Sequence, residues 1–121
     1  MYTIRRFENW GVDSSPAPLA REAAGSVGTS FSVVKVFGSV TGLQRNNRQG
    51  VSLCFLSTTA TDILYVRIVP RGAAAPTISA TNADYVIAAN QTVPIHCGPG
   101  VDLYVAHNNG GTKNFTASEF A

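Results

Sequence analysis

The residues of this chain with the most capacity for chemistry lie close together near its C-terminal end. His96, Cys97, Asp102 and His107 are all possible metal ligands and fall within one short stretch. If residues 92–97 form a strand, however, His96 and Cys97 project from opposite faces and cannot bind the same ion. The spacing therefore predicts no metal site, and nothing else in the chain predicts a cofactor.

Nucleophilic catalysis requires a Ser or Cys beside a base that a third group orients. The chain has many serines and two histidines, but no Gly-x-Ser-x-Gly elbow and no paired acidic residues of the glycosidase kind. The glycines at 25 and 28 lack the Lys and Ser/Thr that complete a phosphate-binding loop. We therefore expect no enzymatic activity.

Two arginines stand in the most polar segment of the sequence. Arg45 and Arg48 flank a pair of asparagines, and their guanidinium groups have the geometry to bind a carboxylate or phosphate of a partner. A solvated hairpin tip explains the same composition more simply. A ligand-binding or lectin-like module that uses this loop together with residues 108–111 remains an alternative.

The elements that must position these residues are short strands. In residues 101–107, Val101, Leu103 and Val105 alternate with more polar neighbours, as in a half-buried strand. The Asn-Asn-Gly-Gly turn at 108–111 predicts a hairpin that returns residues 113–120 beside 101–107. Further strands are expected at 31–40, 51–56, 63–69, 77–80, 85–89 and 92–97. The pattern predicts an all-β protein: an antiparallel β-sandwich, jelly-roll-like or Ig-like, of about seven to eight strands over residues 29–121.

Residues 1–28 show neither a helical nor a strand periodicity, and they predict an extended N-terminal arm. Pro16 and Pro18 favour extended backbone, although residues 18–24 have room for about one helical turn. The arm carries large apolar groups without a core of its own, so these must dock on the sandwich, on another copy or on another protein. The predicted partner-binding residues are Tyr2, Ile4, Arg5, Arg6, Phe7 and Trp10, together with Arg45 and Arg48.

Composition limits the classes of function. A net charge of +2 is too small for a nucleic-acid-binding surface, and no apolar run is long enough to span a membrane. Charged residues make up 13% of the 121 residues, about half the usual share, which favours subunit contacts and a homo-oligomer. Cys54 and Cys97 are expected to be free thiols.

The order of these strands resembles a known group of proteins. The polar residues 45–50 precede the strand 51–56, followed by 63–69, 76–80, 85–95, 100–106 and 108–119. The part with most weight is Ala-Ala-Asn-Gln at 88–91, followed by Pro-Ile-His at 94–96 and Leu-Tyr-Val at 103–105. This order is similar to that of the small β-sandwich virion proteins of tailed bacteriophages, including head decoration or cement proteins.

The resemblance implies a noncatalytic structural protein that binds the major capsid protein on an assembled head and stabilises subunit junctions. It further implies a small oligomer, with a trimer favoured, and a location on the capsid surface after assembly in the bacterial host cytoplasm. A tail, neck or fibre component of the same sandwich type is the alternative within this resemblance.

Overall fold

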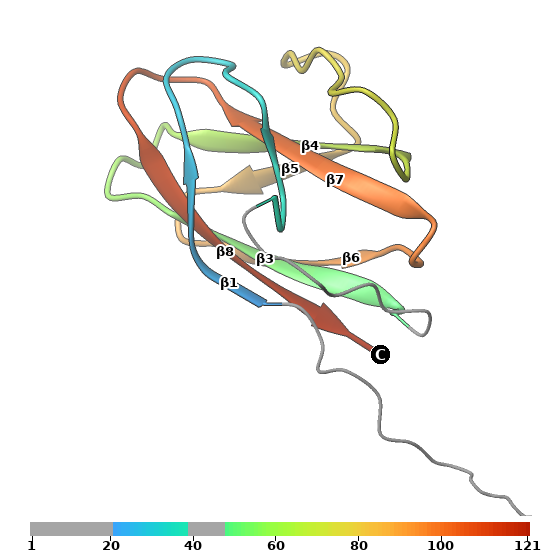
Figure 1. Ribbon diagram of the computed structural model, residues 1–121. Coiled ribbons are helices and arrows are strands. Elements are labelled where there is room, and N and C mark those ends of the chain that lie inside the picture. The colour runs from blue at the N-terminus through green and yellow to red at the C-terminus, as the bar shows by residue number, and fades with distance from the viewer. Residues whose placement is uncertain (1–20, 39–47) are drawn as a thin grey trace, which may run out of the picture.

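The computed structural model of the protein describes residues 21–38 and 48–121, and these form two stacked β-sheets without a helix (Figure 1). One four-stranded sheet has the order β1-β8-β3-β6 and the other the order β2-β7-β4-β5. The strands are β1 (Arg21–Val27), β2 (Val34–Lys35), β3 (Gly50–Leu56), β4 (Ile63–Pro70), β5 (Tyr85–Ala88), β6 (Thr92–His96), β7 (Val101–His107) and β8 (Lys113–Phe120).

The strand pairing is nested. β1 pairs with β8, β2 with β7, β3 with β6 and β4 with β5, all antiparallel. The chain is thus one long antiparallel hairpin, folded over so that alternate pairs fall in opposite sheets, and the β3–β8 and β4–β7 pairings complete each sheet. This is the topology of a jelly roll. The predicted all-β sandwich is confirmed, and of its two expected forms the structure has the jelly roll.

The core lies between the two sheets and follows the alternation of each strand. In β3, Val51, Leu53 and Phe55 are fully buried, while the residues between them face outward. Phe115 of β8 and Leu64 of β4 meet them from the neighbouring strand and from the opposite sheet. Because apolar burial is the main favourable term in folding, this period-2 pattern determines which face of each strand turns inward.

A second apolar layer covers the outer face of the β2-β7-β4-β5 sheet. Tyr65 and Tyr104 point away from the main core, and Ile78 from the β4–β5 connection packs on them. Phe31 stacks on Tyr65 with ring centroids 5.6 Å apart. The connection, residues 71–84, is the yellow segment in Figure 1. Residues 77–80, expected to be a strand, belong to this cover instead and form no ladder.

The sandwich begins earlier in the chain than the sequence predicted. β1 lies inside the stretch assigned to the arm, and it pairs with β8 rather than forming a helical turn. Gly25 explains why the pattern was missed. The Phe115 ring occupies the place of a Cβ on Gly25, with the ring atom Cε2 only 2.5 Å from it, so at this position the strand buries a neighbour's ring instead of its own side chain.

The strand expected over residues 31–40 is described only as far as residue 38, and in that part only the two residues of β2 form a strand. Phe31 and Phe37, on either side of it, adopt left-handed backbone with φ of 59° and 64°. A strand cannot continue through that conformation. The Phe37 amide instead donates to the Glu22 carboxylate, 2.7 Å away.

The prediction that residues 108–111 close a hairpin between 101–107 and 113–120 is wrong. β7 and β8 lie in different sheets, so this turn crosses from one layer to the other. The Asn108 side chain does not close a hairpin but holds the β3–β4 connection: its Oδ1 accepts from the Ile63 amide at 2.9 Å and its Nδ2 donates to the Thr61 carbonyl at 3.2 Å. Turn composition indicates a reversal of the chain, but not which strand the chain joins next.

Candidate functional site

Four connections meet at one end of the sandwich, because every odd-numbered strand runs toward that end and crosses to the other sheet there. They are residues 28–33, 57–62, 89–91 and 108–112. Backbone hydrogen bonds join them: the Phe31 amide donates to the His107 carbonyl at 2.7 Å, and the Ser30 amide to the Asn109 carbonyl at 2.8 Å. Jelly-roll connections of this kind are where binding residues are usually placed by a rigid scaffold.

A buried carboxylate organises this end. Asp62 is 1% exposed and accepts hydrogen bonds from the Ser57 hydroxyl at 2.6 Å and from the Asn109 side-chain amide. The Lys113 ammonium group lies 3.2 Å from it. The bonds from Asn109 and Ser57, and then Lys113, lower the pKa of Asp62 to about 2, against the opposing effect of desolvation. Asp62 is therefore an ionised group that joins the connections 57–62 and 108–112 to the start of β8, and it is not a proton donor or acceptor near neutral pH.

His107 is equally committed to structure. The ring is fully buried against Phe55, its Nδ1 accepts from the Asn109 amide at 3.1 Å, and its Nε2 lies 2.8 Å from the Gly111 carbonyl. Since a carbonyl only accepts, Nε2 carries the proton and the imidazole is neutral. Both ring nitrogens thus shape the 107–111 turn.

The other metal-capable residues lie apart. His96 is exposed on the outer face and packs edge-on against Phe120, whereas Cys97 packs against the main core. The prediction that these two neighbours face opposite ways is confirmed. Across residues 21–38 and 48–121, no three His, Cys, Asp or Glu side chains come together in a group that could hold a metal ion. Cys54 and Cys97 are free thiols, and burial raises the pKa of Cys97.

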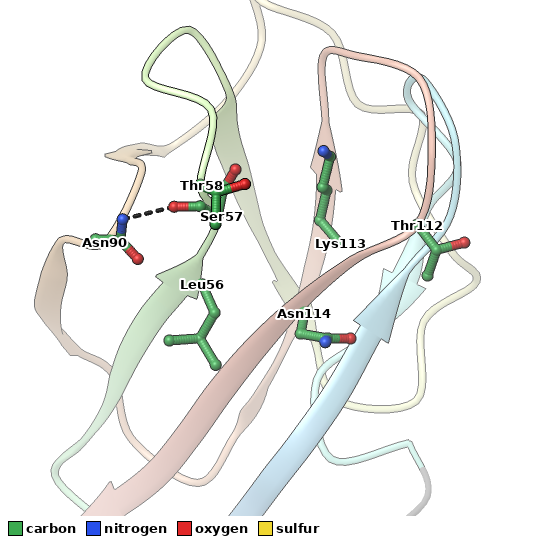
Figure 2. A pocket seen from close by; sticks show the side chains of 7 residues that line it. All are labelled: Leu56, Ser57, Thr58, Asn90, Thr112, Lys113 and Asn114. Atoms are coloured by element: carbon green, nitrogen blue, oxygen red, sulfur yellow. Dashed lines mark hydrogen bonds between the residues drawn. The ribbon is translucent and has the colours of Figure 1, made fainter.

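A shallow hollow opens beside the Asp62 network (Figure 2). Its volume is about 370 Å³ and its wall is mainly polar. Figure 2 shows Asn90 hydrogen-bonded to the Ser57 carbonyl at one side, with Asn114 on the opposite strand. The residues that line it are Leu56, Ser57, Thr58, Asn90, Thr112, Lys113 and Asn114. The only charged residue of this wall, Lys113, is paired with Asp62, and the remaining amide and hydroxyl groups suit a neutral polar ligand better than a charged one.

Most of the predicted partner-binding residues fall outside the described part of the chain. These are Tyr2, Ile4, Arg5, Arg6, Phe7, Trp10 and Arg45, and their role stays a prediction.

Arg48 is described, and its interpretation as part of a solvated hairpin tip is wrong. Its side chain is 5% exposed and donates to the carbonyls of Gly98 and Val101, while Nη1 lies 3.2 Å from the Glu119 carboxylate. The guanidinium does bind a carboxylate, but one in its own protein. It holds the start of β3 against the β6–β7 turn at the end of the sandwich opposite Asp62.

Sequence reasoning missed the Asp62 network for a simple reason. Its members come from two connections and from strand β8, and the bond between Asp62 and Asn109 spans 47 positions. Turn residues are ordinarily interpreted as solvent-facing, so their composition carries no indication that they bond to one another.

Comparison with protein-family models, with curated proteins and with solved structures finds no match. Within residues 21–38 and 48–121, nothing forms a helix with the length and apolarity that a membrane span requires.

Proposed function

We propose that the protein is a noncatalytic structural component of a virus particle, a β-sandwich that decorates or cements the head of a tailed bacteriophage. The observation that carries the proposal is the nested eight-strand topology, since the jelly roll is an architecture of viral capsid domains as well as of lectins. The jelly-roll topology is analogous to that of viral capsid domains, and this likeness of fold adds to the resemblance in strand order.

The chemistry of the described residues supports a binding role over a catalytic one. Three groups at this end of the sandwich that could act as acid, base or nucleophile are engaged in holding the connections: Asp62 by three donors, His107 through both ring nitrogens, and the Ser57 hydroxyl by Asp62. A catalytic base must instead lie within reach of a substrate and titrate near the working pH.

The proposed task is adhesion at capsid subunit junctions. Each apolar anchor of the N-terminal segment contributes on the order of 2 kcal/mol when buried, less the cost of ordering the chain. Repetition over a shell multiplies weak individual contacts through avidity. A tail, neck or fibre component remains the alternative, because the same sandwich serves equally in those rings.

The test is binding to particles. The full-length protein, mixed with heads that lack it, is expected to co-sediment to saturation, and mass spectrometry of purified particles is expected to find it in many copies. The double variant F7A/W10A should lose most of the binding, whereas the matched control S14A/S15A in the same segment should bind normally. Absence from particles, or recovery only with tails, contradicts the head assignment.

A second function is favoured by the hollow beside Asn90. Its amide and hydroxyl lining matches what neutral sugars bind, which supports a carbohydrate-binding module. A glycan array tests this candidate. Binding that N90A or N114A abolishes, and that N82A on the β4–β5 connection leaves intact, would select it over the structural role.

A further inference from the structure

The outer face of the β1-β8-β3-β6 sheet is unusual in its chemistry over three of its four strands, β8, β3 and β6. The edge strand β1 is not part of this face, because the charged residue Arg21 pairs with Ser118 in the β1–β8 ladder. Cross-strand register places the outward side chains of β8, β3 and β6 in adjacent rows. None of them is Asp, Glu, Lys or Arg, although about a quarter to a third of an ordinary soluble surface is charged. This uncharged face consists of Gly50, Ser52, Cys54 and Leu56 of β3, Thr92, Pro94 and His96 of β6, and Asn114, Thr116, Ser118 and Phe120 of β8.

The charges of these strands are on the inward rows. Lys113 and Glu119 of β8 alternate with the outward residues and pair with Asp62 and Arg48 respectively. β8 therefore does contain ionic residues, but they lie on its inward row. The absence of charge on the outer face is more than a consequence of the low charged content of the chain.

The outer face of the opposite sheet, β2-β7-β4-β5, is both covered and charged. There the β4–β5 connection covers Tyr65 and Tyr104, Arg67 donates to the Thr77 carbonyl of that cover, and Lys35 lies 3.4 Å from Asp102. That face is therefore closed by the chain itself and carries charge, while in the described part of the chain no connection packs over the uncharged face.

We propose that the uncharged face is a self-association surface, on which a second copy of this chain packs sheet against sheet about a twofold axis. In such a contact the residues beside the axis lie near their own counterparts, so a charged residue there meets its own sign. A face without charge avoids that repulsion and loses no ionic hydration when buried. Interface centres are depleted in charge for the same reason.

The dimensions predict a weak dimer. Three strands about 4.8 Å apart and up to about 23 Å long cover roughly 300 Å² in projection, which is less than half of what each partner buries in a standard interface. We expect a Kd for the dimer of roughly 10–100 µM, so the dimer forms where the local concentration of the protein is high. The contact pairs copies, so a trimer would use a different surface.

The middle of the face supplies sharp probes. Thr116 on β8 and Cys54 on β3 are directly opposite each other in the ladder, and both are half-buried. An axis through the middle of the sheet brings each of them within about 10 Å of its counterpart in the second copy, given the usual spacing between packed sheets.

Charge substitution at Thr116 tests the axis directly. Sedimentation of the full-length protein up to 1 mM should show a monomer–dimer equilibrium that T116K and T116E each weaken at least tenfold. An equimolar mixture of T116K and T116E should associate again, because opposite charges then meet. V86K, at a 56% exposed position on the edge strand β5 of the other sheet, is the matched control and should dimerise normally.

Cross-linking gives a second, independent measurement. In a C97A background, a short bis-maleimide should join two chains through Cys54 into a species of twice the 12.8 kDa mass, and C54S should yield none. A monomer at every concentration, a dimer that T116K leaves intact, or one that V86K disrupts would overturn the proposal. If T116K unfolds the protein by circular dichroism, S52K and S52E, on the middle strand β3 of the face, replace the Thr116 variants in the same design. These outcomes are independent of whether the protein is found in virus particles.

Discussion

Replacing Arg48 with Met should destabilise the fold strongly, because Arg48 joins three parts of the chain at one buried point. Its side chain is 5% exposed and that of Glu119 is 7% exposed, with 3.2 Å between Nη1 and Oε2. The same guanidinium donates at 2.5 Å and 2.8 Å to the carbonyls of Gly98 and Val101. Met keeps the apolar stem and removes every donor.

The size of the effect follows from burial. Removing one partner of a buried, hydrogen-bonded ion pair costs about 3–5 kcal/mol, because the remaining charge and carbonyls keep their desolvation cost. For a domain of this length that corresponds to a fall in melting temperature on the order of 10–20 °C. Arg71→Met is the matched control: Arg71 is exposed, so its loss should cost less than about 0.5 kcal/mol.

Urea unfolding followed by circular dichroism measures the cost, and a double-mutant cycle isolates the pair. R48M/E119Q should be more stable than the sum of the two single changes implies, by about 2 kcal/mol, because it leaves no unbalanced charge. The reasoning is refuted if R48M costs less than about 1 kcal/mol or no more than R71M.

Cys97 provides a second readout of the same contact. Burial raises the pKa of this thiol, the Arg48 charge lowers it, and the Glu119 charge raises it. R48M removes the lowering influence, so the Cys97 pKa should rise further and alkylation at pH 8 should slow. E119Q should have the opposite effect. A C54S background confines the measurement to Cys97.

Two further predictions concern the backbone and acid stability. Gly50→Ala places a Cβ about 2.5 Å from the Ile95 carbonyl oxygen in the β3–β6 ladder, so it should lower the free energy of unfolding by about 1–3 kcal/mol, measured by thermal unfolding. Gly100→Ala is the control, because the space around Gly100 is open, and it should be neutral or slightly stabilising. Equal effects of the two changes would contradict this difference in packing. The pKa of Asp62 falls from 3.8 to about 2 on folding, so its ionised form stabilises the native state fully above about pH 4, and this contribution is lost as the pH falls toward 2. Asp62→Asn should flatten the stability profile in that interval, and an unchanged acid slope would show that other carboxylates dominate it.

The strands could be predicted where burial imposes a local pattern. The predicted bounds of β3, β4, β7 and β8 agree with the structure to within a residue. β3 and β8 alternate between an inward row and an outward row, whereas β4 and β7 are buried on both faces, because the β4–β5 connection covers their outer side. The failures have physical causes that a local pattern does not contain. Left-handed backbone at Phe31 and Phe37 shortens β2, and the ring of Phe115, 90 positions away, takes the place of a side chain at Gly25 in β1.

The candidate site was less predictable than the fold. That His96 and Cys97 face opposite ways follows from strand period alone, and it was predicted correctly. That Arg48 is buried could not be foreseen, because its acceptors lie 50 and more positions along the chain. A polar residue in a polar segment has the same local pattern whether it meets water or a distant carbonyl.

The amino-acid sequence by itself determined the class of this protein: an all-β sandwich whose strands turn one row of side chains inward, because burial of apolar groups acts on each strand separately. Only the tertiary structure decided the nested jelly-roll order, since turns at residues 57–62 and 108–112 cross between sheets instead of closing hairpins. It also decided that the ionic groups of β8 lie inward and that an uncharged face remains outside. Those features depend on pairings between residues far apart in sequence, where contacts of the whole fold outweigh local preference.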